Sequence, residues 1–152
     1  MLDSVDVKIL KCLEENARMN ASVIGERINM SVSAVIERIK KLEAAGIIRK
    51  YTVVLDNKKI NKDVSAYISV RLDHPKHNDQ FVRGIDSISE VVESNYIAGD
   101  YDFLLKVVTE STDTLAVLLN RVKSLPGVSL TRTLVVLSTT KDGHAVLPDD
   151  SK

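Results

Sequence analysis

The sequence predicts an α+β protein that joins an N-terminal winged helix-turn-helix to a C-terminal ferredoxin-like domain. Two short helical patterns meet at a tight turn near residue 30, and a β-branched segment follows the second of them. From Val64 onward the patterns follow the order β-α-β-β-α-β, which is the order of a ferredoxin-like sheet. We therefore expect an N-terminal domain at 1–54, a linker at 55–63, a C-terminal domain at 64–140 and a flexible tail at 141–152.

The first thirty residues predict two helices and a turn. Residues 3–16, DSVDVKILKCLEEN, form an amphipathic pattern, and Asp3 is a residue type that caps helices. The inward face of this helix would carry Val5, Ile9 and Leu13. Residues 20–28 predict a second short helix, and residues 29 and 30 form the turn that follows it.

The third helix lies in residues 31–51, SVSAVIERIKKLEAAGIIRKY, and organises the N-terminal domain. Ser31 can cap its start, and Gly46 ends it. The side that faces the domain carries Val35, Ile39 and Leu42, and the opposite side carries Ser33, Glu37, Lys40 and Lys41. The segment IIRKYTVVL at 47–55 reads as a strand and would form the wing.

This arrangement predicts a DNA-binding surface, because the second helix of a helix-turn-helix enters the major groove with its N-terminal residues nearest the bases. We expect base contacts from Ser33 and Glu37 and a phosphate contact from Lys50 on the wing. Arg38 lies beside the buried stripe, where it would contact phosphate or brace the wing. The candidate DNA-binding residues are Ser31, Ser33, Ala34, Glu37, Arg38, Lys41 and Lys50. A three-helix bundle packed on a strand, with Glu37 and the lysines as a surface network, is the alternative.

Charge is distributed unevenly along a chain whose formal net charge is zero. Residues 1–62 hold twelve Lys and Arg against eight Asp and Glu, a net charge of +4, which leaves −4 for residues 63–152. This asymmetry fits a first half that faces phosphate and a second half that faces something else. Because +4 is modest, non-specific DNA affinity of a monomer should be weak, and oligomerisation would raise it.

The C-terminal half predicts a four-stranded sheet with helices on one face. Val64–Leu72 alternates apolar and polar residues, and a short helix before residue 86 would turn Phe81, Val82 and Ile85 inward. Strands at 90–98 and 101–108 would be joined by a two-residue turn of Gly99 and Asp100. Ser111 caps a second helix, and a last strand covers 128–138. The uncovered sheet face would expose Tyr67, Ile97, Leu104 and Val108, so we expect a dimer through this domain.

The chain resembles the Lrp/AsnC family of leucine-responsive, or feast/famine, transcription regulators. The resemblance rests on LDSVDVKIL and SVSAVIERIKKLEAAGIIRKYTVVLD in the first half, and on NYIAGDYDFLLKV and LPGVSLTRTLVVL in the second. These four blocks span nearly the whole chain. The resemblance implies binding to double-stranded DNA and a homodimer that assembles into tetramers, octamers or higher forms.

The resemblance also implies a small-molecule effector, an amino acid, bound between C-terminal domains of neighbouring dimers. Carried over onto this sequence, the effector site includes Gly99, Asp100, Asp102, Thr131 and Thr133. Asp100 would hold an ammonium group, although aspartate is also a common turn residue. Ala98 stands where many members carry serine or threonine, which removes one hydroxyl from the expected pocket.

Two other functions share this architecture: a siroheme-decarboxylase-like enzyme and an architectural DNA-binding protein without an effector. An enzyme of that kind would need histidines in the C-terminal pocket, but the three histidines fall in loops or the tail. We expect no catalytic residues, no cofactor and no metal site, because His74 and His77 flank a proline without a third ligand nearby. No apolar run reaches the ~18 residues that span a bilayer, so we expect no membrane partner and a cytoplasmic location.

Overall fold

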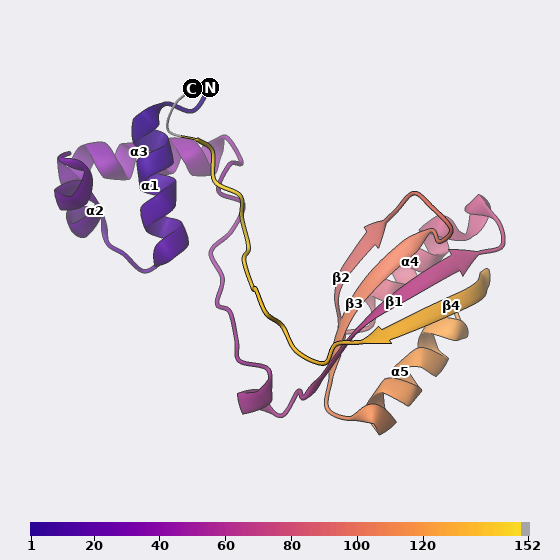
Figure 1. Ribbon diagram of the computed structural model, residues 1–152. Helices are drawn as coiled ribbons and strands as arrows, with labels where there is room; N and C mark the ends of the chain where they lie inside the picture. The colour runs from indigo at the N-terminus through magenta and orange to yellow at the C-terminus, as the bar shows by residue number, and fades with distance from the viewer. Residues whose placement is uncertain (150–152) are drawn as a thin grey trace. The chain divides into compact units, whose positions relative to one another are not determined.

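The computed structural model describes residues 1–149 and contains two compact units (Figure 1). The first unit comprises Met1–Val54 together with the chain from Lys141 onward, and the second comprises Leu55–Thr140. The predicted tail therefore groups with the N-terminal helices, and its last three residues lie outside the described residues. Each unit is built around its own apolar core.

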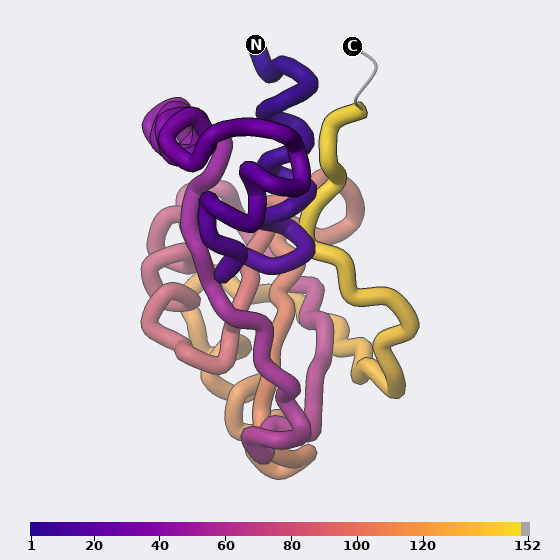
Figure 2. The backbone as a smooth tube through the Cα atoms, turned by 90° about the vertical axis from the view of Figure 1, so that its left-hand side faces the viewer, coloured from indigo at the N-terminus to yellow at the C-terminus, as the bar shows by residue number. Residues whose placement is uncertain are grey.

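The first unit consists of α1 (Ser4–Glu15), α2 (Ala21–Ile28) and α3 (Val32–Ala44). The helix α3 runs across Figure 1 and is seen nearly end-on in Figure 2. As predicted, Asp3 and Ser31 cap α1 and α3, and the side chains of Asp3 and Asp6 form a reciprocal capping box. The fully or nearly fully buried core residues are Ile9, Cys12, Ile24, Val35 and Leu42.

The turn between α2 and α3 depends on a close backbone approach. Asn29 takes the left-handed conformation with φ of 57°, and the N–H of Met30 then donates to the carbonyl of Gly25 at 2.8 Å. A Cβ atom on residue 25 would lie 2.5 Å from the Met30 carbonyl oxygen. Glycine at this position therefore lets the turn close onto α2 and sets the direction in which α3 starts.

The prediction of a wing strand at 47–55 is wrong, because these residues pair with no other strand within the described part of the chain. The N–H groups of Ile47 and Ile48 donate instead to the carbonyl of Leu42 and close the end of α3. Beyond them the chain continues extended and leaves Val53 and Val54 exposed. A β-branched sequence favours extended backbone, but a strand also needs a neighbour with which to pair.

The second unit is a four-stranded antiparallel sheet of order β2-β3-β1-β4, with α4 and α5 on one of its faces (Figure 1). Its strands are β1 (Val64–Leu72), β2 (Val91–Tyr96), β3 (Phe103–Thr109) and β4 (Val128–Val135). Its helices are α4 (Asn78–Asp86) and α5 (Thr112–Lys123), with the short 3-10 turns η1 (Lys58–Ile60) and η2 (Pro75–His77). The predicted ferredoxin-like order of elements is confirmed.

Alternation along the strands determines which side chains reach the core. Ala66, Ile68 and Val70 of β1 are fully buried beneath the helices, and Phe103, Leu105 and Val107 of β3 join them. Phe81 and Ile85 of α4 point inward as predicted, but Val82 does not, because it is 49% exposed. On the opposite, uncovered face lie Tyr67, Leu104, Val108, Leu130 and Leu134.

The connection between β2 and β3 is longer than predicted. The last strand pair is Tyr96 with Phe103, so residues 97–102 form the loop rather than Gly99 and Asp100 alone. Asp102 closes this loop by accepting the Ile97 N–H, and it is also bonded to β1: its N–H donates to the Val70 carbonyl, and its carboxylate accepts from the Leu72 N–H. These two bonds draw the end of the loop toward β1. Ile97, predicted on the uncovered sheet face, lies in the loop because β2 ends at Tyr96. The last strand, β4, ends at Val135 rather than at residue 138.

Candidate DNA-binding and effector sites

The outer face of α3 is polar and exposed, while its inner face completes the core of the first unit. Val35 and Leu42 are buried, and Ser33, Glu37, Lys40 and Lys41 are exposed. This separation follows from the 100° rotation per residue, because the apolar stripe faces α1 and α2. The exposed face begins at the N-terminus of α3, where a recognition helix brings its residues nearest to the bases.

Ser31 and Ala34 act on the start of the helix itself. The Ser31 hydroxyl accepts the Ala34 N–H at 3.2 Å and lies 3.3 Å from the Ser33 hydroxyl. Ala34 is half-buried, so its side chain offers little surface to a partner. The Ser33 hydroxyl is exposed and shares this one hydrogen bond with Ser31, so it can still turn to a base edge. DNA contact by all three residues stays a prediction.

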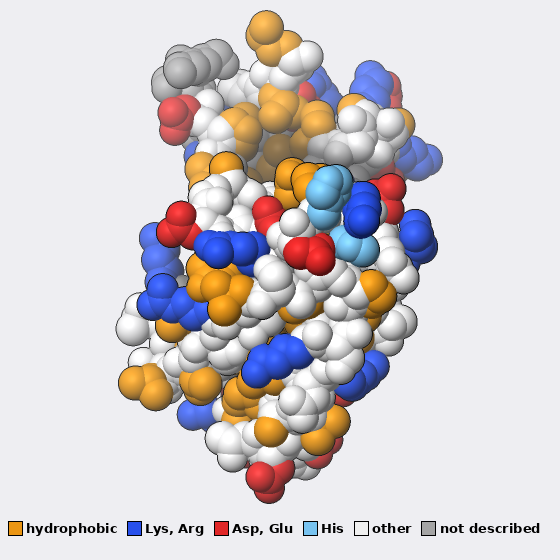
Figure 3. Space-filling model, turned by 90° about the vertical axis from the view of Figure 1, so that its right-hand side faces the viewer, with side chains coloured by type: hydrophobic (Ala, Val, Ile, Leu, Met, Phe, Trp, Pro, Cys, Tyr) orange, Lys and Arg blue, Asp and Glu red, His pale blue; other side chains and the backbone are white. Residues whose placement is uncertain are grey.

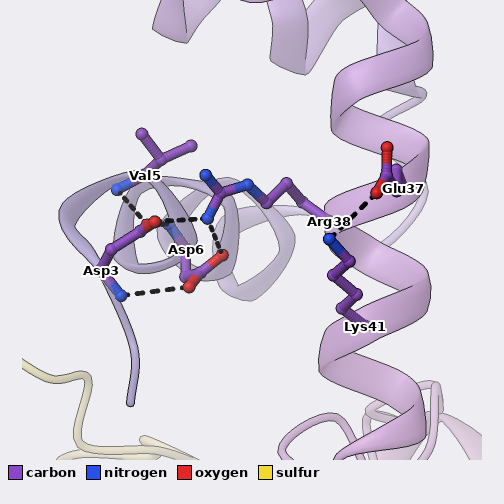
Figure 4. A network of polar contacts seen from close by, with 6 residues as sticks. All are labelled: Asp3, Val5, Asp6, Glu37, Arg38 and Lys41. Atoms are coloured by element: carbon purple, nitrogen blue, oxygen red, sulfur yellow. Dashed lines mark hydrogen bonds and ion pairs between the residues drawn. The ribbon is translucent and has the colours of Figure 1, made fainter.

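Glu37 and Lys41 form an ion pair one helical turn apart, with 2.9 Å between carboxylate and ammonium (Figure 4). The hydrogen bond from Lys41, and then its charge, lower the pKa of Glu37. Both side chains are more than two-thirds exposed, so this pair contributes little to stability and can open for a partner. Lys40, between them in sequence, is exposed and makes no ion pair within the described residues.

Arg38 points away from this surface and reaches α1 (Figure 4). Its guanidinium donates to the carboxylates of Asp3 and Asp6, at 3.0 Å for Asp6. The hydrogen bonds that Arg38 donates to Asp3, and then to Asp6, raise the pKa of Arg38. The structure therefore gives Arg38 a bracing role toward α1, where the sequence suggested bracing of the wing, and a phosphate contact stays a prediction.

Lys50 lies exposed on the extended segment after α3 and makes no ion pair within residues 1–149. Its neighbour Tyr51 anchors this segment, because the Tyr51 hydroxyl donates to the Glu43 carboxylate of α3 at 2.8 Å. Partial burial, and then this hydrogen bond, raise the pKa of Tyr51 to about 12. The anchor holds the Lys50 backbone near the C-terminal end of α3 and leaves its ammonium free.

In the second unit, the two aspartates of the β2–β3 loop differ in their contacts: Asp102 is bonded within the fold, and Asp100 is exposed. Asp102 is occupied, because its carboxylate accepts the Leu72 N–H at 2.7 Å. Asp100 is exposed, and its carboxylate has no hydrogen-bond partner within the described residues. Gly99 takes φ of 129°, which only glycine adopts readily, and a Cβ there would meet nothing within 4 Å. Asp100 is thus presented at an open turn.

Arg71, at the end of β1, lies against this turn. Its Nε donates to the Asp100 carbonyl at 2.8 Å, and its guanidinium carbon lies 5.4 Å from the centre of the Tyr101 ring. The terminal guanidinium nitrogens have no acceptor within the described residues. The same turn therefore carries a cation with free donors and an exposed carboxylate.

Thr131 and Thr133 lie elsewhere in the same copy. They belong to β4, which pairs with β1 at the edge of the sheet away from β2. Their register partners are Val70 and Ile68, which are buried under the helices, so the two threonine side chains face the helix side. One copy of the chain does not bring them together with Gly99, Asp100 and Asp102, and their role stays a prediction.

Histidine side chains lie at the surface among acidic and basic side chains (Figure 3). His77 is 3.4 Å from the Asp73 carboxylate, and His74 accepts the Lys76 N–H. Within the part of the chain that the structure describes, no group of three or more His, Cys, Asp and Glu is placed to hold a metal ion. No helix in that part is long and apolar enough to cross a membrane.

Comparison with known proteins decides the family. Residues 2–49 match the winged helix-turn-helix DNA-binding model, and residues 65–146 match the Lrp/AsnC ligand binding domain model. The chain belongs to the Lrp/AsnC family. The transcriptional regulator FL11 of Pyrococcus horikoshii is 31% identical over 93% of both chains, and LrpB of Bacillus subtilis is 38% identical over 78% of this chain and 79% of its own length. A Neisseria meningitidis transcriptional regulator in complex with L-methionine is 28% identical and superposes with a TM-score of 0.91 over 96% of both chains.

The structure of this Lrp/AsnC chain adds two candidates, Lys40 and Arg71, to the residues chosen from the sequence. Lys40 shares the outer face of α3 with Ser33 and Glu37, and the helical spacing alone would have included it. Arg71 gave no such signal. It alternates with buried residues along β1, but its place beside Asp100 follows from the β1–β3 pairing and from the length of the loop.

Proposed function

We propose that this Lrp/AsnC protein regulates transcription by binding specific sites on double-stranded DNA, and that an amino-acid effector changes its DNA affinity or its assembly. The observation that carries the DNA-binding half is the exposed face of α3, which begins at a capped N-terminus and is backed by a complete core. Ser33 and Glu37 are the proposed base contacts, and Lys40, Lys41 and Lys50 are the proposed phosphate contacts. Since its partner would be the chromosome, the cytoplasm is the proposed location.

The effector half rests on the loop between β2 and β3. A zwitterionic amino acid needs an anion for its ammonium and hydrogen-bond donors for its carboxylate. Asp100 supplies the first, and Arg71 supplies the second with its unused guanidinium donors. The matched family domain is described as ligand binding, and the Neisseria relative holds L-methionine. An amino acid is therefore the proposed ligand class, with Thr131 and Thr133 as proposed contributions from a neighbouring copy.

The uncovered sheet face supports assembly into at least a dimer, and by family resemblance into tetramers or octamers. Leu134 of β4 is 54% exposed and pairs with Tyr67 of β1, and both lie on the face without helices. Burying such side chains between two copies would stabilise a dimer. Two copies would place two α3 helices on half-sites about one DNA turn, or a multiple of it, apart.

Retardation of genomic DNA fragments by the full chain at low salt tests the DNA-binding half. Failure to retard any fragment would overturn it. A thermal-shift screen with amino acids tests the effector half, because a ligand that binds only the folded state raises the melting temperature. DNA binding combined with no response to any amino acid would favour an architectural DNA-binding protein instead.

Light scattering tests the assembly. The proposal requires a mass above the 16.8 kDa of one chain at micromolar concentration. Leu134→Lys should shift the species toward the monomer, because a lysine cannot be buried unpaired between two sheet faces. Val117→Lys, at an exposed position of α5 on the helix side, is the matched control and should leave the mass unchanged.

A further inference from the structure

Two partly exposed apolar side chains lie on α3 along the boundary between its buried face and its polar outer face. Val32 is 46% exposed and Ile36 is 41% exposed, although each belongs to a residue type that is usually buried. They lie one helical turn apart and therefore form a single short stripe. Neither belongs to the core cluster of the first unit, which is complete without them.

The surroundings of this stripe fit DNA better than a protein partner. Ser33 and Glu37 follow its two members in the sequence, and Lys40 lies one turn beyond Ile36 with a free ammonium group. A stable protein interface buries about 800 Å² on each side, far more than two side chains offer. The protein instead places hydroxyl, carboxylate and ammonium groups beside a small apolar stripe. This combination complements the major-groove edge of DNA, where polar groups surround one type of methyl group.

We propose that Val32 and Ile36 read thymine by packing against its C5-methyl group. In unmodified DNA this methyl is the apolar group that the major groove displays, and it distinguishes thymine from cytosine. Both residues lie in the first two turns of α3, the part of a recognition helix that is closest to the bases. This inference rests on the proposed DNA binding and specifies thymine as the base that the apolar stripe contacts.

Replacing thymine by uracil tests the inference, because uracil keeps every hydrogen bond of thymine and lacks only the methyl. The full-length protein is first used to select its preferred site from a pool of random duplexes. That site is then synthesised with deoxyuridine at one thymidine position at a time. Dissociation constants are measured by fluorescence anisotropy at one fixed salt concentration for the native chain and for Ile36→Ala and Val32→Ala.

We expect uracil at one or more positions of a half-site to weaken binding by the native chain about three- to fivefold, the effect of one methyl group removed from an apolar contact. The same uracil should change binding by Ile36→Ala or Val32→Ala less than about twofold, because the methyl has lost its partner. Alanine at an exposed helix position favours helix formation, so both variants should fold. Val82→Ala, at an exposed position of α4, is the matched control and should keep the full uracil effect.

Equal uracil effects in the native chain and in both variants would overturn the inference, as would a native chain that is insensitive to every uracil. In either case, the fact that a preferred site had been selected would still support the proposed sequence-specific DNA binding. A selection that yields no preferred sequence would instead overturn the proposed sequence-specific DNA binding, and the thymine contact with it.

Discussion

The guanidinium of Arg38 in α3 lies 3.0 Å from the carboxylate of Asp6 in α1, and the same nitrogen donates to Asp3, the N-cap of α1. Asp6 is mostly buried, whereas Arg38 and Asp3 are partly exposed. The pair joins residues that are far apart in the sequence and lie on different helices. Because the pair joins α3 to α1, we expect it to help hold α3, and with it the proposed DNA-binding face, in place within the first unit.

If Arg38 braces α3, removing either partner should weaken DNA binding in the same direction. Arg38→Gln and Asp6→Asn should both lower the melting temperature and reduce affinity for all sequences. The double variant should be little worse than either single one, because each change breaks the same interaction. Thermal unfolding and anisotropy titrations with one duplex measure the two effects.

A phosphate contact by Arg38 predicts a different pattern. Arg38→Gln would then lower the slope of log affinity against log salt by about one unit. Asp6→Asn would strengthen DNA binding, since it removes a negative charge and releases the cation. Opposite signs for the two variants would therefore contradict the bracing role.

The charge on Asp3 should make the first unit more stable at neutral pH than in acid. The N–H of Asp6, and then the Arg38 guanidinium, lower the pKa of Asp3 below its usual value of 3.8. Because the folded-state pKa lies below the unfolded one, this contribution is complete above pH 3.8 and is lost as the pH falls through the lowered value.

Asp3→Asn isolates this effect, since asparagine keeps a capping oxygen but has no charge. The difference in melting temperature between the native chain and this variant should be constant near neutral pH and should narrow below pH 3.8. Other acidic groups titrate in both proteins and cancel in the comparison. A difference that stays constant in strong acid would show that the Asp3 charge is not stabilising.

Lys40, which was not among the DNA contacts predicted from the sequence, should contribute to the salt dependence of DNA binding. Lys40→Ala should flatten the log–log salt slope by about 0.9, the effect of one phosphate contact, for every duplex tested. Lys41→Ala should also flatten the slope, because in the native chain Lys41 can leave its ion pair with Glu37 to contact phosphate. Ser33→Ala should instead change which sequences are preferred and leave the slope unaltered.

Lys123→Ala, on α5 of the second unit, is a charge-matched control for the salt titrations. Its slope should equal that of the native chain. If Lys40→Ala and Lys123→Ala shift the slope equally, the change reflects net charge alone, and Lys40 does not contact phosphate.

Asp100 and Arg71 should bind opposite ends of the effector. Asp100→Asn keeps the turn but removes the charge, and it should weaken binding of L-methionine, or of the best amino acid from the screen, about ten- to a hundredfold. Arg71→Gln should have an effect of similar size through the carboxylate. Calorimetric titration measures both. DNA affinity without ligand should be unchanged, since the two residues lie outside the helix-turn-helix unit.

Asp102→Ala separates ligand binding from structure. Because the Asp102 carboxylate accepts the Leu72 N–H, its loss should lower the melting temperature without any ligand present. Asp100→Asn should leave that temperature unaltered. An Asp100→Asn protein with native ligand affinity would remove Asp100 from the effector site.

The sequence by itself determined the elements whose signals are local. Asp3, Ser31 and Ser111 cap the helices that they precede, because a cap bonds to N–H groups two or three residues away. Alternation along residues 64–72 fixed which face of β1 is buried, since successive side chains of a strand point to opposite faces. Helical spacing likewise defined the outer face of α3, including Lys40, which was left out of the predicted DNA contacts.

Tertiary structure alone decided what each polar group contacts across the fold. Arg38 meets Asp3 and Asp6 because α1 packs against α3, and Asp102 is used by β1 because the loop bends toward it. The segment 47–55 is extended without becoming a strand, and Thr131 lies at the sheet edge away from the β2–β3 loop. Side-chain type and helical spacing carry no information about partners that are tens of residues away. Those partners are set by packing and by strand register.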